Sequence, residues 1–130
     1  EICKYLESNG FILAFYIGPQ EKDYQKVLKD SFKNAIFLEN EKSLNNYSNI
    51  EIIMASTKFL KFAISNDSGV SHMLSTNYCP LIKLFGPKDS KKFTPKLQNL
   101  ITVTSSEVNS NKIDDISVQR VKTVIEEVCL

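Results

Sequence analysis

Continuous apolar runs alternate with amphipathic stretches along the whole chain. The runs predict buried strands, and they lie at residues 11–17, 35–38, 61–65, 80–85 and 100–104. Apolar residues recur at helical spacing in the segments before, between and after these runs. This spacing predicts helices over residues 1–9, 21–32, 48–58, 70–77 and 116–130. Strands that alternate with helices indicate an α/β fold, in which a parallel sheet of about five strands carries helices on both faces.

Helical spacing also predicts which side chains of the helices face the core. The expected core residues are Tyr24, Val27, Leu28 and Phe32, then Ile50, Ile53, Met54 and Thr57, and finally Val118, Val121, Ile125 and Val128. The polar segment 105–115 is expected to be a mobile loop, and the basic segment 88–99 a second loop.

One position conflicts with the pattern of buried strands. Lys83 lies inside an apolar strand, so either that position opens to solvent or the buried stem lets the ammonium reach the surface.

Composition narrows the classes of protein that the chain can belong to. The 130 residues carry a net charge of +1, which gives no general attraction to nucleic acid or to an anionic membrane. Arg120 is the one arginine, so an arginine-rich phosphate clamp is excluded. The three cysteines are widely spaced, which disfavours zinc and disulfides and indicates a reducing compartment. No apolar run is long enough to span a membrane.

The chain is expected to be one domain, residues 1–130. It starts at Glu1 within a helix-like segment, so we expect it to be the carboxyl-terminal part of a longer protein.

The turn after the 61–65 strand carries the strongest candidate chemistry. Asp67 and Ser68 are residue types that cap helices, and Gly69 permits close backbone approach. A helix start presents unpaired N–H groups and a positive dipole end, so this turn can bind phosphate. His72 falls in the first turn of the following helix and can face the same anion. Asp67 itself should hold the turn's N–H groups, because two anions repel. A plain capped turn is the alternative.

Other loops are expected at the same edge of the sheet, because strand-to-helix loops of an alternating α/β chain emerge together. They offer Gly18 and Glu21 after the first strand, Ser48 and Ile50 at a helix start, and Gly86 after the fourth strand. This set suits a nucleotide: Glu21 can accept ribose hydroxyls, and the backbone near Ser48 and Ile50 can meet the base. Glu21 can equally be a first-turn acid that stabilises its helix, and Ser48 with Glu51 a simple cap.

Several spaced motifs resemble the carboxyl-terminal half of the lipopolysaccharide heptosyltransferases, glycosyltransferase family nine. They are Ile64-Ser65-Asn66-Asp67-Ser68-Gly69-Val70-Ser71-His72, Cys79-Pro80, Leu84-Phe85-Gly86-Pro87-Lys88-Asp89 and Thr94-Pro95, with Gly18-Pro19-Gln20-Glu21 upstream. The resemblance implies a Rossmann-like domain, the C-terminal half of a two-domain GT-B fold. It implies a donor site in which Asp67, Ser68, Gly69 and His72 wrap the diphosphate of a nucleotide-sugar, usually ADP-heptose, and Glu21 contacts the ribose.

The resemblance also implies partners and a location. They are a nucleotide-sugar, an amino-terminal acceptor domain absent from this sequence, and a lipid-linked acceptor at the membrane surface. The protein would be cytoplasmic, with or without peripheral attachment to the inner membrane. No cofactor, metal or nucleic acid is implied. Since the acceptor domain carries the family's proposed general base, this chain alone should bind donor weakly and should not catalyse. The residues around Met73 and Leu74 depart from the family's small residues. A non-catalytic scaffold of the same fold and a UDP-sugar GT-B transferase or epimerase remain alternatives.

Overall fold

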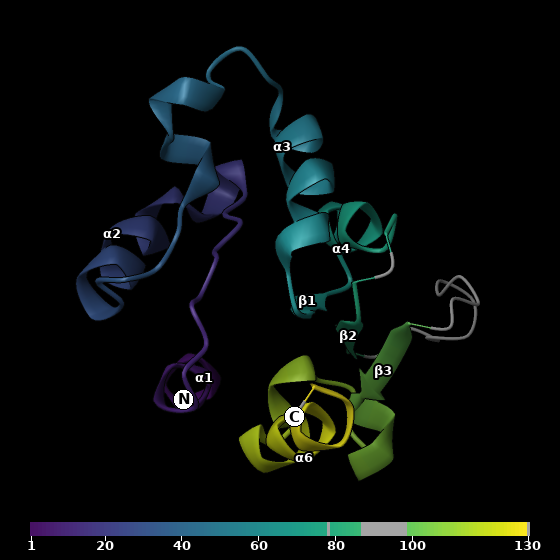
Figure 1. Ribbon diagram of the computed structural model, residues 1–130. Helices are drawn as coiled ribbons and strands as arrows, with labels where there is room; N and C mark the ends of the chain where they lie inside the picture. Colours follow the sequence, from purple (N-terminus) through teal and green to yellow (C-terminus); the bar gives the residue numbers. More distant parts are fainter. Residues whose placement is uncertain (78, 87–98, 130) are drawn as a thin grey trace. The chain divides into compact units, whose positions relative to one another are not determined.

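A computed structural model describes residues 1–77, 79–86 and 99–129 of the chain (Figure 1). It divides into two compact units, Glu1–Ile52 and Ile53–Leu130. Each unit is described by itself below.

A parallel sheet forms the centre of the second unit. Its strands are β1 (Ala63–Asn66), β2 (Leu81–Phe85) and β3 (Leu100–Thr104), in the order β1-β2-β3. The register pairs Ile64 with Ile82 and Ile82 with Ile101. The central strand is the most buried because it has a neighbour on both sides, and its exposure falls to 1% at Leu81 and 0% at Ile82. The predicted parallel α/β architecture is therefore confirmed.

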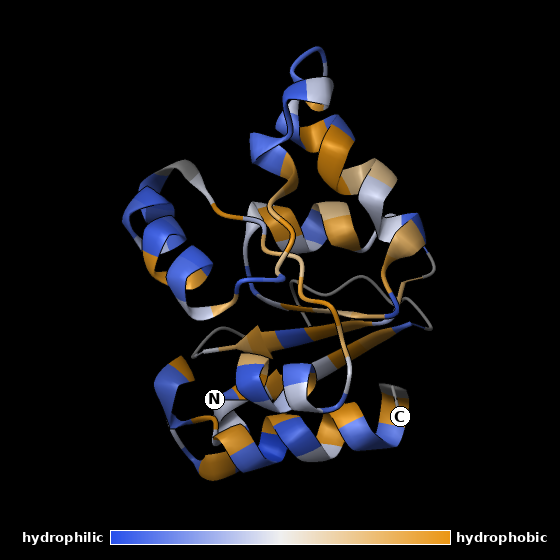
Figure 2. Cartoon of the chain, turned by 60° about the vertical axis from the view of Figure 1, so that its left-hand side comes forward, coloured by the Kyte–Doolittle hydropathy of each residue, from blue (hydrophilic) through white to orange (hydrophobic). Residues whose placement is uncertain are grey.

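Helices cover both faces of this sheet. In Figures 1 and 2, α4 (Gly69–Leu74) lies on one face and α6 (Val118–Cys129) on the other. Orange and blue residues alternate along α6, which is therefore amphipathic (Figure 2). Its buried side chains include Val121, Val124 and Ile125. Val121 and Ile125 were predicted and Val124 was not, while the expected core residue Val128 is 41% exposed near the helix end.

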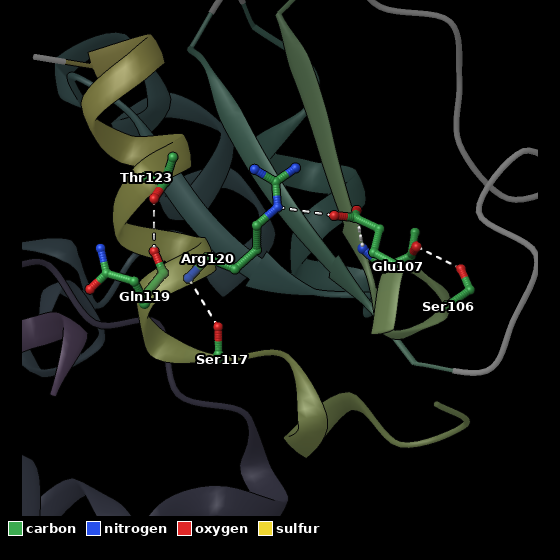
Figure 3. Close-up of polar contacts among 7 residues, drawn as sticks. Ser106, Glu107, Ser117, Gln119, Arg120 and Thr123 are labelled. Carbon is green, nitrogen blue, oxygen red and sulfur yellow. Dashed lines mark hydrogen bonds and ion pairs between the residues drawn. The ribbon is translucent and has the colours of Figure 1, made fainter. Parts of the chain in front are cut away.

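The segment after β3, expected to be polar and mobile, contains two short helices and its own hydrogen bonds. It forms the 3-10 helices η5 (Ser105–Val108) and η6 (Ile113–Asp115). The Ser105 hydroxyl is fully buried and donates to the Ser110 carbonyl at 2.9 Å. The Glu107 carboxylate accepts the Thr104 N–H at 3.0 Å and Nε of Arg120 at 3.0 Å, which joins η5 to α6 (Figure 3).

The first unit is mainly helical. Its elements are α1 (Ile2–Ser8), η1 (Pro19–Glu21), α2 (Lys22–Ser31), η2 (Leu38–Asn40), η3 (Lys42–Leu44) and the start of α3 (Asn49–Ser56). The two strands expected here reduce to one parallel bridge between Ala14 and Ile36. The parts of the chain that the structure describes thus hold three named strands, and the expected five are not confirmed.

Aromatic packing stabilises the first unit. The ring of Phe15 lies 5.7 Å from that of Phe32 and 5.5 Å from that of Phe37, centroid to centroid. Phe32 and Phe37 are each 8% exposed. Phe32 was predicted to be buried, but the predicted core residues Tyr24 and Val27 of α2 are 67% and 60% exposed.

The helix α3 begins in the first unit and ends in the second, where η4 (Thr57–Phe59) follows it. Ile53 and Thr57 are buried, as helical spacing predicts. Ile50 and Met54 are 53% and 39% exposed, so their placement in the core was wrong. Ile52 and Ser56 are buried instead of Ile50 and Met54, because the buried face of α3 is rotated about the helix axis from the expected one.

Candidate functional site

The turn between β1 and α4 has the predicted strand, turn and helix geometry. Asp67 follows the last residue of β1, Ser68 is the extended N-cap with φ −147° and ψ 170°, and α4 begins at Gly69. The hydroxyl of Ser71 accepts the Ser68 N–H at 3.3 Å and donates to the Ser68 carbonyl at 2.7 Å. Ser71 is 1% exposed. A buried hydroxyl therefore fixes the N-cap from inside the helix.

The carboxylate of Asp67 forms an ion pair with the buried lysine of the central strand. Lys83 Nζ lies 2.8 Å from Asp67 Oδ1, and the two side chains are 2% and 19% exposed. This contact resolves the conflict that Lys83 poses in the sequence, since neither an opening to solvent nor an ammonium at the surface is needed. The ammonium also lies 4.9 Å from the ring centroid of Phe85, which is a cation–π distance.

Strand register explains how these three side chains meet. Lys83 is paired with Ser65 across the β1–β2 ladder. Side chains alternate between the faces of a sheet, so Asp67 and Phe85, each two residues further along, lie on the same face as Ser65 and Lys83. Sequence reasoning noted Lys83 and Asp67 separately and missed their pairing. No local sequence pattern marks the pair, because only the strand register brings the two residues together.

Gly69 faces open space. A Cβ atom built on it meets nothing within 4 Å among the residues described, and its φ is outside the range that favours glycine. The amides of Gly69 and Val70, the first two of α4, have no hydrogen-bond partner in the described part of the chain. His72 is exposed on the same short helix. Neither backbone strain nor packing thus accounts for a glycine at this position.

Gly86 directly follows the last residue of β2 and so lies at the same sheet edge as the end of β1. A Cβ atom on Gly86 would lie 3.6 Å from the backbone nitrogen and from Cβ of Ile113, which is ordinary van der Waals contact. Gly86 therefore packs beside η6. The motif residues Pro87, Lys88, Thr94 and Pro95, and the basic loop that contains them, lie outside the described residues.

Gly18 and Glu21 form a local cap in the first unit. Glu21 Oε2 accepts the Gly18 N–H at 3.2 Å, while the Glu21 N–H donates to the Gly18 carbonyl at 3.0 Å. A Cβ atom on Gly18 would lie 3.3 Å from Glu21 Oε2. The neighbouring Ile17 N–H donates to Glu39 at 3.0 Å, a carboxylate that sequence reasoning missed because nothing in its local pattern marks it. The Glu21 side chain is exposed, so its carboxylate is accessible from solvent although it accepts the Gly18 N–H.

Ser48 and Glu51 form the predicted capping box at the start of α3. The carboxylate of Glu51 accepts the Ser48 N–H at 2.8 Å and the Ser48 hydroxyl at 2.7 Å. The Glu51 N–H in turn donates to the Ser48 hydroxyl oxygen at 3.3 Å. The hydrogen bond from the hydroxyl, and after it that from the amide, lowers the pKa of Glu51. Ser48 and Ile50 are both exposed.

The candidate residues thus fall into two groups. Asp67, Ser68, Gly69, His72 and Gly86 belong to the second unit, where the structure places them in one turn and at the end of the adjacent strand. Gly18, Glu21, Ser48 and Ile50 belong to the first unit, at two separate helix starts.

Across residues 1–77, 79–86 and 99–129, no three His, Cys, Asp or Glu side chains come together as metal ligands would. The helices of that same part of the chain are all too short or too polar to cross a bilayer.

Comparisons with known proteins give a consistent family. The family model of glycosyltransferase family 9 (heptosyltransferase) matches residues 1–122. The fold is similar to E. coli heptosyltransferase WaaC with ADP, with a TM-score of 0.78 and 23% identity over 97% of this chain and 37% of that one. The same protein with ADP-2-deoxy-2-fluoro heptose gives a TM-score of 0.74 and 24% identity over 97% and 36%.

A third solved structure, the family 9 glycosyl transferase from Veillonella parvula DSM 2008, gives a TM-score of 0.78. Its identity is 18% over 98% of this chain and 39% of that chain. No curated protein matches. The chain thus spans little more than a third of the length of these structures, and at such identities the likeness shows the fold.

Proposed function

The chain belongs to glycosyltransferase family 9, the heptosyltransferases, and on this basis we propose that it is the donor-binding half of a glycosyltransferase. The observation that carries the proposal is the family match over residues 1–122, which includes the whole turn from Asp67 to His72. The donor would be a nucleotide-sugar such as ADP-heptose. The similar fold of a heptosyltransferase with ADP supports this choice of nucleotide.

In this proposal the diphosphate binds at the start of α4. The amides of Gly69 and Val70, which have no partner among the described residues, would donate to phosphate oxygens, and the exposed His72 would add a donor beside them. The open space in front of Gly69 supports the assignment, because an incoming anion needs the room that a Cβ atom would fill. Ser68 holds the turn as N-cap, and Gly86 leaves the adjacent strand end without a side chain.

The nucleoside would be bound by the first unit. Glu21 is exposed, and a carboxylate has enough acceptor sites to bind ribose hydroxyls while it holds the Gly18 N–H. The base would contact the backbone near Ser48 and the side chain of Ile50, which is 53% exposed. An apolar side chain in solvent is a suitable partner for the face of a base.

The proposed reaction is transfer of the sugar to an acceptor hydroxyl. The bond between the anomeric carbon and the diphosphate oxygen breaks, and the diphosphate leaves with the electron pair while the hydroxyl oxygen forms the new bond. The amides at the start of α4 and His72 would stabilise the charge that develops on the departing diphosphate, without a metal or cofactor. A base in an amino-terminal acceptor domain would take the hydroxyl proton.

We further propose the setting in which the protein acts. The acceptor would be lipid-linked at the membrane surface, in lipopolysaccharide core synthesis. The protein would be cytoplasmic, with or without peripheral attachment to the inner membrane.

A glycine-to-alanine variant of the 130-residue chain tests the diphosphate site. Gly69→Ala should leave the melting temperature within about 2 °C, because the new methyl group meets no described atom. It should weaken ADP binding by about tenfold or more, because the methyl group occupies the space needed by the phosphate. Titration with ADP, followed by amide NMR of residues 68–72, measures the affinity. Ser75→Ala, at the other end of α4, is the matched control and should bind like the parent.

Two results would contradict the proposal. Unchanged amide signals at both Ser68–His72 and Glu21 in millimolar ADP would count against a donor site in this chain. Tighter binding of UDP than of ADP would replace ADP-heptose by a UDP-sugar donor.

A further inference from the structure

Lys83 is a charged residue at one of the most buried positions of the second unit. It lies in the middle of β2, the strand with a neighbour on each side, and its side chain is 2% exposed. Lysine is rarely buried in this way unless a partner compensates its charge. The adjoining Ile82 and the nearby Phe85 are apolar and 0% exposed. A neutral residue at this position would avoid the cost of burying a charge, so the presence of lysine indicates a functional role for the ammonium.

The ammonium group is held in one place by two contacts. Nζ lies 2.8 Å from Asp67 Oδ1 and 4.9 Å from the centroid of the Phe85 ring. Both partners follow from the parallel register, which fixes Ser65 opposite Lys83. A buried ammonium with a carboxylate on one side and an aromatic face on the other has little freedom to move.

Asp67 connects the fixed Lys83 ammonium to the turn before α4. It is the residue directly between the end of β1 and the N-cap Ser68. The turn is therefore tied to the fold at two points: Lys83 holds Asp67, and the buried hydroxyl of Ser71 holds both backbone groups of Ser68. The amides of Gly69 and Val70, which lack a described partner, come immediately after these two anchors.

We propose that Lys83 is a positioning residue for the nucleotide diphosphate and acts through Asp67. This inference rests on the proposed donor site. Lys83 binds Asp67 Oδ1, fixes the carboxylate at the sheet edge, and thereby sets the direction of the amides that follow it. Lys83 does not touch the diphosphate, because its side chain is 2% exposed and its charge is compensated by Asp67.

The test compares three variants of the 130-residue chain with the parent. Lys83→Met keeps the length and apolar stem of the side chain and removes its charge. Asp67→Asn/Lys83→Met removes both charges of the ion pair together. Lys58→Met is the control, since Lys58 is an exposed lysine of the same unit. Each variant is measured for its ADP dissociation constant, its melting temperature, and the amide shifts and exchange rates of residues 68–70 without ADP.

We expect Lys83→Met to move the amide signals of residues 68–70 and speed their exchange in the absence of ADP, and to raise the ADP dissociation constant by about tenfold. The double variant should show the same loss and no more, because Lys83 acts through Asp67. Lys58→Met should match the parent. A merely structural Lys83 would lower the melting temperature without moving the dissociation constant at a temperature where all variants are folded.

The outcomes separate this inference from the proposed function. If Lys83→Met is folded, binds ADP like the parent and leaves the turn amides unmoved, the positioning role is wrong while the donor site stands. If the parent itself gives no response to ADP, the donor site fails and the inference fails with it. A double variant that loses much more affinity than Lys83→Met would show that Asp67 acts independently of Lys83.

Discussion

At the scale of single residues, the Lys83–Asp67 ion pair is the feature that most constrains the second unit. A buried pair contributes less to stability than its short distance suggests, because both charges lose their hydration. Removal of Asp67 alone is different, because the Lys83 ammonium left behind is a buried charge without its carboxylate. Lys83 is the more buried of the two, so the sign and size of the effect depend on which member is removed.

Asp67→Asn should therefore destabilise the chain strongly. It leaves an ammonium at 2% exposure without its carboxylate, and we expect a loss of about 3–5 kcal/mol in the free energy of unfolding. Urea denaturation measures the loss. Asp30→Asn is the matched control, because Asp30 pairs with Lys33 at 3.4 Å where both side chains are more than 60% exposed, and its effect should stay within about 0.5 kcal/mol. Equal effects of the two changes would contradict the buried pair.

Residue-level features were predictable from the sequence where they are local. The cap of Ser48 by Glu51 was predicted because both partners lie within one turn of helix. The ion pair of Lys83 was not, because its partner is sixteen positions away and is identified only by the strand register. Ile50 failed for a related reason: local spacing gives a helix an apolar face but leaves its exact rotation to tertiary packing.

At the scale of elements, an apolar run by itself predicts neither a strand nor full burial. Residues 11–17 were expected to form a strand, yet Ile12 is 74% exposed. The ladder pairing of this segment is limited to one parallel bridge between Ala14 and Ile36 among the residues described. A strand needs a partner along its length to satisfy its backbone, and local sequence does not specify that partner. The three strands β1, β2 and β3 have such neighbours, and their predicted positions agree with the structure within two residues.

The link between η5 and α6 should depend on pH. The hydrogen bond from the Thr104 N–H, with a smaller contribution from Arg120, lowers the pKa of Glu107. A carboxylate with a lowered pKa adds stability above its unfolded pKa and loses it as pH falls through the folded value. Glu107→Gln should therefore cost roughly 0.5–1 kcal/mol at pH 7, a modest value because the ion pair is partly exposed, and the difference from the parent should shrink below about pH 4.

Urea denaturation of both proteins between pH 7 and pH 3 measures this dependence. Glu127→Gln is the control, because Glu127 is an exposed glutamate of α6, and its effect should be near zero at every pH. A cost for Glu107→Gln that stays constant through acid pH would show that the carboxylate's charge is not involved.

At the scale of the whole molecule, the alternation of strands and helices was enough to predict a parallel α/β fold. The family resemblance was carried by spaced motifs around Asp67 to His72, and the family match over residues 1–122 confirms it. The division into Glu1–Ile52 and Ile53–Leu130 was not predicted, because no change of composition marks residue 52. Burial decides such a boundary, and burial depends on contacts that sequence periodicity does not contain.

The whole chain should bind donor without turning it over. It spans little more than a third of the heptosyltransferase structures that it resembles. In the mechanism that we propose, the base for the acceptor hydroxyl lies in an amino-terminal acceptor domain. Incubation with ADP-heptose and a lipid acceptor should release no ADP above the rate in buffer. Binding of ADP by the same chain in the NMR titration provides the control for folding. Measurable ADP release by this chain would show that it carries its own base.

The burial of the Lys83–Asp67 pair limits the substitutions that the gene can tolerate at these two positions. A change of Asp67 alone leaves the buried Lys83 ammonium without the carboxylate that compensates it. Descendants of this gene that keep Lys83 should therefore also keep an acidic residue at position 67, and forms with Lys83 but a neutral residue there should be rare and short-lived.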